Sequence, residues 1–203
     1  MDNQEKLAFK IEFSKAGRIG INTRITTSGL KKEETGLEGC FVLDFPENRD
    51  IRGNFFRKYC IDDFKRLNLN TSWPQTNYSS NDKAGTLRGF HYQSAPFQEV
   101  KLVTCVSGSI YDVILDLRSE SETYLQTFSI NLKADSNTLL YIAKGIAHAY
   151  LTLEDNSSIL YQVSENYSLQ NTHGVGYLDP KVNVEWPIEP KYVSNNDMNW
   201  KNL

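Results

Sequence analysis

Residues 101–118 read KLVTCVSGSIYDVILDLR, and this stretch decides the fold class. It holds two runs rich in β-branched and apolar residues, separated by the triplet SGS at 107–109. Runs of this kind, bounded by glycine and serine, are typical of β-strands, and the triplet predicts a hairpin between them. The sequences DSN at 135–137 and EDNS at 154–157 predict similar turns.

The same pattern extends along most of the chain. The runs that we interpret as strands are GCFVLDF (39–45), GTLRGFHYQ (85–93), KLVTCV (101–106), SIYDVILDLR (109–118), TFSINLK (127–133), TLLYIA (138–143), HAYLTL (148–153), SSILYQVS (157–164) and VNVEWP (182–187). Their even spacing predicts a sandwich or barrel of antiparallel strands. Only IDDFKRLNL (61–69) predicts a helix.

Length and charge limit the other possibilities. The 203 residues fit one domain of ordinary size, and the polar start of the chain suggests an N-terminal extension over residues 1–33 and a domain over residues 34–203. A net charge of −3 offers no general basic surface, so we expect neither a nucleic acid nor an anionic membrane as partner. No stretch is apolar and long enough for a signal peptide or a membrane span, so we expect a cytoplasmic protein.

Cysteine and histidine do not indicate a metal site. The cysteines Cys40, Cys60 and Cys105 are widely spaced, with no CxxC pair, so we interpret them as free thiols. Metal sites in β-sandwich enzymes commonly use an HxH pair followed by a carboxylate. Here the residue two positions after His91 is Gln93, so we expect no metal.

The stretch LRGFHYQ (87–93) places Arg88 and His91 three positions apart on one predicted strand. Odd spacing sends two side chains to opposite faces of a regular strand. Both can face one pocket only if Gly89 forms a bulge, which is a common role for a strand glycine beside an active site. The residues alone leave this interpretation level with a second one, a surface arginine and a hydrogen-bonded core histidine.

Other polar residues within predicted strands are open to the same choice. Asp112 interrupts an apolar run and needs a partner if it is buried, and His148 is the candidate. Taken alone, Asp112 and Lys101 are better interpreted as facing solvent. Tyr161 and Tyr167 share a face if their strand continues, and a phenol can serve as core filler or as a proton donor.

The chain resembles the dTDP-4-dehydrorhamnose 3,5-epimerase family in an ordered set of stretches over about residues 35–200. They are DIRGNFF (50–56), PQTNYS (74–79), GTLRGFHYQ (85–93), QEVKLVTCVSGSIYDVILDLR (98–118), YIAKGIAHAYLTLED (141–155), ILYQVSENYS (159–168), GVGYLDPKVNVEWP (174–187) and VSNND (193–197). The resemblance implies an all-β double-stranded β-helix, the cupin or jelly-roll fold, with a few short helices. It also implies a homodimer with N-terminal strands exchanged between subunits.

The resemblance implies a cofactor-free isomerase that epimerises a nucleotide-linked 4-keto-6-deoxyhexose through an enolate, at both C3 and C5 of dTDP-4-dehydro-6-deoxy-D-glucose. His91 matches the base and Asp197 its orienting carboxylate. Tyr161 matches the proton donor on the opposite face of the sugar, and Lys101 the residue that steadies the enolate oxygen. The implied pathway makes a deoxysugar for the O-antigen of lipopolysaccharide or for another surface polysaccharide.

The resemblance also implies the residues that bind the substrate. They are Arg52 and Arg88 for the diphosphate, Gln75 and Asn77 as polar pocket residues, Phe55 and Tyr167 as aromatics near base and sugar, and His148 with Asp112 as a buried pair. Arg57 stands where many members carry Glu, which puts the choice between dTDP and a CDP- or GDP-linked sugar in doubt. Arg52, Phe55 and Arg57 could belong to the neighbouring subunit's site.

Two alternatives are open at this point. One is a relative that inverts a single carbon or moves the keto group, since these reactions also pass through enolates. The other is a non-catalytic cupin that binds a sugar nucleotide. The joint presence of His91, Asp197, Lys101 and Tyr161 argues against the second.

Overall fold

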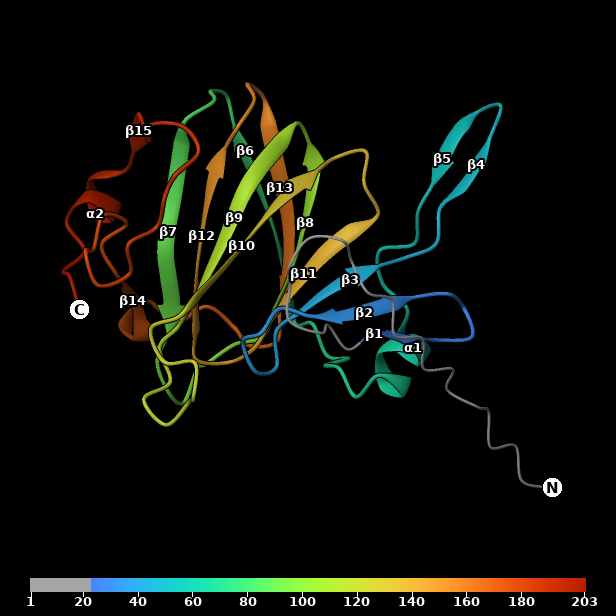
Figure 1. Cartoon of the computed structure of the whole chain (residues 1–203), viewed down its shortest axis with the longest axis horizontal. Helices are drawn as coiled ribbons and strands as arrows, with labels where there is room; N and C mark the ends of the chain where they lie inside the picture. The colour runs from blue at the N-terminus through green and yellow to red at the C-terminus, as the bar shows by residue number, and fades with distance from the viewer. Residues whose placement is uncertain (1–22) are drawn as a thin grey trace.

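The computed structural model describes residues 23–203, and they form two facing β-sheets (Figure 1). The larger sheet has the strand order β1-β2-β3-β11-β8-β13-β6 and the smaller one the order β10-β9-β12-β7-β14, with β15 paired in parallel to β7. The strands of the larger sheet are β1 (Thr23–Ile25), β2 (Lys31–Glu34), β3 (Phe41–Asp44), β6 (Gln75–Asn81), β8 (Lys101–Ser107), β11 (Thr138–Ile142) and β13 (Ser157–Val163). Those of the smaller sheet are β7 (Thr86–Gln93), β9 (Ser109–Asp116), β10 (Thr127–Lys133), β12 (Ile146–Thr152), β14 (Thr172–Gly174) and β15 (Tyr192–Val193). With the short helices α1 (Ile61–Arg66), η1 (Leu169–Asn171) and α2 (Asn195–Met198), this confirms the predicted all-β double-stranded β-helix.

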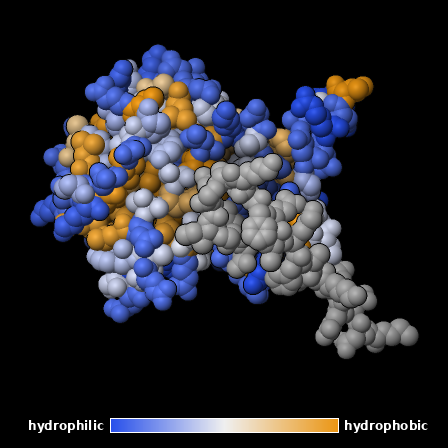
Figure 2. Space-filling model, viewed as in Figure 1, coloured by the Kyte–Doolittle hydropathy of each residue, from blue (hydrophilic) through white to orange (hydrophobic). Residues whose placement is uncertain are grey.

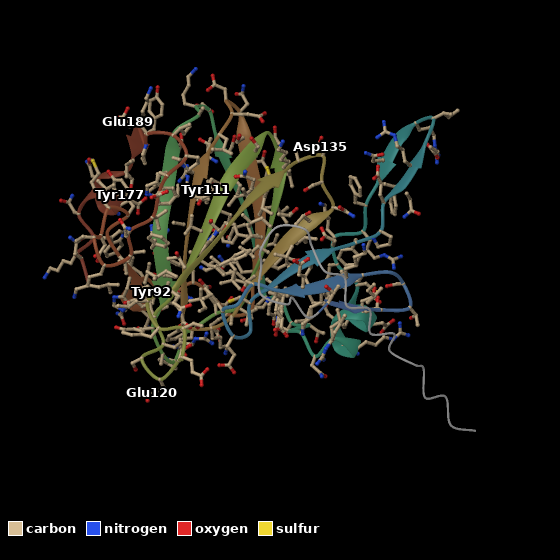
Figure 3. All side chains as sticks on the ribbon, viewed as in Figure 1. Tyr92, Tyr111, Glu120, Asp135, Tyr177 and Glu189 are labelled. Carbon is tan, nitrogen blue, oxygen red and sulfur yellow. The ribbon has the colours of Figure 1, made fainter. Side chains whose placement is uncertain are left out.

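Successive strands from β6 to β13 switch between the two sheets, except that β9 and β10 pair with each other. The turns at 107–109, 135–137 and 154–157 therefore carry the chain from one sheet to the other, and the hairpin predicted for 107–109 is wrong. Turn residues report a reversal of the chain but not which strands then hydrogen-bond. Figure 3 shows the turn carrying Asp135 and the loop carrying Glu120 at opposite ends of the sandwich.

Three apolar clusters hold the layers together. The main core lies between the sheets and joins side chains such as Val103 from the larger sheet with Ile114 from the smaller one. A second cluster covers the outer face of the larger sheet with Phe64 of α1, and a third covers the outer face of the smaller sheet with Val182 of the C-terminal region. Every residue of β12 is buried as a result.

The structure differs from the strand prediction at one predicted run and at several strands that were not predicted, of which β6 is the longest. Residues 182–187 form no strand, although Val182, Val184 and Trp186 pack against the smaller sheet. The polar segment β6, QTNYSSN, was not predicted as a strand, and it forms because it pairs along its whole length with β13. The predicted helix at 61–69 is confirmed as α1.

The start of the described chain contains two features that bear on assembly. β1 and β2 add to the edge of the larger sheet through β3, so residues 23–33 of the predicted extension lie against the domain, and residues 1–22 are outside the described residues. The hairpin of β4 (Asn48–Asp50) and β5 (Gly53–Phe55) forms a separate two-stranded sheet that projects from the body (Figure 1).

Candidate active site

A pocket of about 500 Å³ opens between the two sheets. Strands β6, β8 and β13 of the larger sheet form one wall, and β7 and β14 of the smaller sheet form the other. The C-terminal region around α2 closes one side. The lining residues are Gln75, Asn77, Arg88, His91, Tyr92, Gln93, Glu99, Lys101, Tyr161, Val163, Tyr167, Thr172, Ser194, Asn196, Asp197 and Trp200.

His91 and Asp197 form a dyad in this pocket. His91 Nε2 lies 2.5 Å from Asp197 Oδ1, although the two residues are 106 positions apart. Asp197 is in the first turn of α2, where its backbone N–H donates to Ser194 Oγ, and its Oδ1 also accepts from Trp200 Nε1 at 3.2 Å. Burial opposes ionisation of Asp197, but the hydrogen bonds and charge of His91 outweigh it and lower the pKa of this carboxyl. A fixed carboxylate on one ring nitrogen leaves the other free to accept a proton.

Gly89 brings Arg88 and His91 into the same pocket, as the bulge hypothesis requires. His148 of β12 lies opposite His91 of β7, and Tyr150 lies opposite Arg88. Between these two pairs β7 has two residues and β12 has one, so the register shifts there. Gly89 has a φ of +120°, and a Cβ here would lie 2.5 Å from the carbonyl oxygen of His148. Only glycine fits this backbone conformation and this close approach. Arg88 is held by a hydrogen bond from its Nε to Asn81 Oδ1 at 2.8 Å.

Lys101 faces the pocket rather than solvent. Its residue is buried, and its Nζ lies 2.5 Å from Glu99 Oε1. Glu99 was not singled out from the sequence, although a signal existed: residues two positions apart in an extended segment share a side. The expectation that Lys101 taken alone faces solvent is therefore wrong, because the larger sheet is covered on both faces at this position.

Tyr161 and Tyr167 both line the pocket, but not on one continuous strand. β13 ends at Val163, and Tyr167 is placed by its loop, in which its backbone N–H donates to Gln75 Oε1 at 3.2 Å. Gln75 Nε2 also donates to Asn77 Oδ1 at 2.9 Å. Burial, followed by Tyr150 and Glu99, raises the pKa of the Tyr161 phenol, while Arg88 opposes the rise. Tyr161 therefore holds its proton well above neutral pH.

His148 and Asp112 form a buried pair, so the interpretation of Asp112 taken alone as facing solvent is wrong. His148 Nε2 lies 2.9 and 3.0 Å from the two carboxylate oxygens of Asp112. The pair does not line the pocket, but His148 is the cross-strand neighbour of His91. It therefore supports the strand that carries the dyad. In residues 23–203 no three His, Cys, Asp or Glu side chains come together as a metal-binding group.

Arg52, Phe55 and Arg57 do not join these residues. All three are exposed and lie on or just after the β4–β5 hairpin, and none lines the pocket. Arg52 is bound to Asp50, with Nη2 2.6 Å from Oδ2. Ile51 at the turn is fully exposed and Phe55 of β5 largely so, and Figure 2 shows a hydrophobic patch at the tip of the hairpin.

The pocket also contains residues that the sequence did not indicate. Besides Glu99, these include Trp200, which bonds to Asp197, and Ser194, which caps α2. Ser194 belongs to the stretch VSNND and could have been recognised as a helix cap. Trp200 had no local signal, since its ring reaches the site by packing against Gly174, where a Cβ would lie 2.4 Å from the indole.

Comparison with known proteins gives one consistent result. Residues 34–203 match the family model described as dTDP-4-dehydrorhamnose 3,5-epimerase. The enzyme of that name from Shigella flexneri is 34% identical over 151 residues, which are 74% of this chain and 83% of the relative. A dTDP-4-dehydrorhamnose 3-epimerase from Streptomyces niveus is 32% identical over 169 residues, 83% of this chain and 81% of the relative.

Solved structures agree with these matches. A crystal structure of dTDP-4-dehydrorhamnose 3,5-epimerase from Bacillus anthracis, with TDP and PPi bound, superposes with a TM-score of 0.84 at 34% identity, covering 86% of this chain and all of that one. The fold, the pocket and these likenesses agree with the resemblance in the sequence. The chain therefore belongs to the dTDP-4-dehydrorhamnose 3,5-epimerase family and is an epimerase.

Proposed function

We propose that the chain inverts C3 and C5 of dTDP-4-dehydro-6-deoxy-D-glucose to give dTDP-4-dehydro-L-rhamnose. One observation carries the proposal: the His91–Asp197 dyad comes from the smaller sheet side of the pocket, while Tyr161 and Lys101 come from the larger sheet. Inversion of a carbon needs a base on one face of the sugar and a proton donor on the other. Two facing walls supply that arrangement.

The residues divide the reaction between them. His91 removes the proton from the carbon beside the ketone, and Asp197 stabilises the imidazolium that forms. The Lys101 ammonium, inside a largely buried wall, steadies the negative charge on the C4 oxygen. Tyr161, which holds its proton because of burial, returns a proton to the opposite face. We propose no metal or organic cofactor for these steps.

The charge balance of the pocket supports the proposal that a second subunit contributes to the site. The charged side chains lining the pocket of the described chain are Arg88, Lys101, Glu99 and Asp197, so the two cations are balanced by two anions. A sugar nucleotide brings a diphosphate, which needs additional cations. The exposed hairpin carries Arg52 and, just beyond it, Arg57.

We therefore extend the proposal to a homodimer in which the β4–β5 hairpin of each subunit completes the partner's site. In this arrangement Arg57 contributes to recognition of the nucleotide. We keep residues 34–203 as the catalytic domain and residues 1–33 as an extension, of which the described part, residues 23–33, adds to the chain's own sheet through β3. Within residues 23–203, no helix has the length and apolar character needed to cross a membrane. We place the enzyme in the cytoplasm, in synthesis of a deoxysugar for O-antigen or another surface polysaccharide.

The test is solvent exchange followed by NMR. The protein is incubated in D₂O with dTDP-4-dehydro-6-deoxy-D-glucose, and deuterium and configuration are read at each carbon. We expect deuterium and inversion at both C3 and C5. Inversion at one carbon would indicate a single-position epimerase, and a moved ketone an isomerase. No exchange with this substrate or its CDP- and GDP-linked analogues would overturn the proposal in favour of a binding protein.

A further inference from the structure

Glu99 is the charged residue of the pocket wall to which the proposed chemistry gives no role. Its Oε1 lies 2.5 Å from Lys101 Nζ, and each of the two side chains is only 10% exposed. A buried carboxylate beside a developing enolate is unfavourable by itself, because like charges repel. Its presence here therefore calls for a compensating role.

Glu99 is anchored from the opposite wall. Its Oε2 accepts from Gln93 Nε2 at 3.2 Å, and Gln93 is buried on β7, two residues after His91. Gln93 is itself fixed: its two Nε2 hydrogens are shared among Glu99 Oε2 and the carbonyl oxygens of Phe97 and Asn166, and its Oε1 accepts from the Ser168 N–H. The carboxylate is thus a fixed point that links the wall carrying the base with the wall carrying the lysine.

Lys101 depends on this fixed point for its orientation. A lysine side chain is flexible, with three N–H donors at its end. In the described chain the hydrogen bond found for Nζ is the one to Glu99, so two donors are left for the pocket. One ion pair therefore decides where those donors point.

We propose that Glu99 is a positioning residue: its carboxylate aims the Lys101 ammonium at the enolate oxygen and keeps a negative charge in the pocket that the Tyr161 phenol also lines. This inference rests on the proposed function and deepens it. The groups that act electrostatically on Tyr161 are Tyr150 on β12, Glu99, and Arg88 on β7. The other charged and titratable groups lining the same pocket are His91, Tyr92, Lys101, Tyr167 and Asp197. Burial is the main cause of the raised pKa of Tyr161, followed by Tyr150 and then Glu99, so we expect removal of the Glu99 charge to lower that pKa.

The test compares Glu99→Gln with the matched control Glu165→Gln, which removes a carboxylate from the loop after β13 that does not line the pocket. For Glu99→Gln we expect kcat for inversion to fall about tenfold or more with little change in KM. The reason is that the Lys101 ammonium no longer points its N–H groups at the enolate oxygen. We also expect the alkaline limb of the kcat profile to move to lower pH. Glu165→Gln is expected to retain the wild-type values of both.

A substrate-free measurement separates this inference from the proposed function. The Tyr161 phenol is titrated by NMR with ¹³C-labelled tyrosine, and its signal is assigned by its absence in Tyr161→Phe. The titration midpoint is expected to fall in Glu99→Gln and to be unchanged in Glu99→Asp, which keeps the charge but retracts it from Lys101. Glu99→Asp is expected to lose kcat all the same.

Each outcome decides the matter. Wild-type kcat in Glu99→Gln overturns the inference. A fall in kcat with the Tyr161 midpoint and the alkaline limb unchanged shows a merely structural role and also overturns it. If the wild-type protein exchanges no deuterium, the proposed function fails, and the Tyr161 titration still tests the effect of Glu99. If Glu99→Gln does not fold, Glu99→Asp decides, because full kcat in that variant contradicts the positioning role.

Discussion

The pocket and the β4–β5 hairpin both carry residues that match the family's substrate-binding pattern, yet the two regions are held in opposite ways. In the pocket, the ion pairs are tied to other parts of the fold: His91 pairs with Asp197, 106 positions away, and Glu99, which pairs with its near neighbour Lys101, is also bound by Gln93 of β7. On the hairpin, Arg52 is bound only by its neighbour Asp50 among the described residues, and Ile51 is fully exposed.

This difference motivates the proposal that one chain supplies the reacting groups while a second subunit supplies further contacts to the diphosphate. Buried charges are tolerated in the pocket because the partners that compensate them are fixed by both sheets. The hairpin has no such support, so its side chains can act on the substrate only if a second subunit receives them. The predictions that follow test this division.

The largest effect is expected from the base. His91→Ala is expected to reduce deuterium exchange at both C3 and C5 by about 10²–10⁴-fold, because it removes the group that takes the proton. Tyr161→Phe is expected to block inversion while exchange at one carbon continues, since the base is still present. NMR in D₂O measures both variants. Normal turnover of His91→Ala would remove the assignment.

The body of the domain is expected to lose stability in acid through Asp116 at the end of β9. Burial opposes ionisation here, but bonds from Arg118, Ser121 and Thr123 outweigh it and hold the pKa of this carboxyl well below its usual range. The contribution of ionised Asp116 to the free energy of unfolding is therefore complete above the pKa of about 3.9 that the residue has in the unfolded chain. It is lost as the pH falls from there toward the lower pKa of the folded state.

The matched variant is Asp116→Asn, expected to cost about 2–4 kcal/mol at pH 7 and to flatten the change in stability between about pH 5 and pH 2. Urea unfolding at several pH values measures both. Asp135→Asn is the control, because that residue is exposed in the turn between β10 and β11. An equal slope in Asp116→Asn and wild type would show that Asp116 is not the acid-sensitive group.

The hairpin is expected to act in trans. Arg52→Ala should lower kcat/KM about 10- to 100-fold, chiefly through KM, as expected for one charge-assisted contact to the diphosphate. Mixing it with His91→Ala after joint refolding should restore about a quarter of wild-type activity, since half the dimers of a symmetric pair are hybrids with one intact site. If the mixture is no more active than its parts, Arg52 serves its own chain's site.

The smallest effect is expected at the hairpin tip. Ile51→Ala should change the free energy of unfolding by less than about 0.5 kcal/mol, because the side chain is fully exposed in the described chain. The matched substitution in the body, Ile114→Ala between the sheets, should cost about 2–5 kcal/mol. Chemical denaturation compares the two. A large loss in Ile51→Ala would show that the tip is buried against another subunit.

Sequence patterns predicted most strands because alternation and composition are local properties. They failed where pairing decides the outcome: β6 is polar and forms only beside β13, and 182–187 packs without pairing. The site shows the same limit. The Gly89 bulge could be proposed from the odd spacing of Arg88 and His91, and it is present. Glu99 was not proposed although its spacing from Lys101 offered a signal, and Trp200 was not proposed because its position depends on a contact made after folding.

The sequence by itself determined the β-rich class, the shortage of metal ligands, and the residue types needed for an enolate reaction. Only the tertiary structure decided that the turn at 107–109 links two sheets, that Lys101 is buried against Glu99, and that the hairpin lies away from the pocket. The physical reason is the distance along the sequence between the groups that interact. Strand formation follows from neighbouring residues, whereas sheet pairing and charge compensation depend on groups that may be a hundred positions apart, as His91 and Asp197 are.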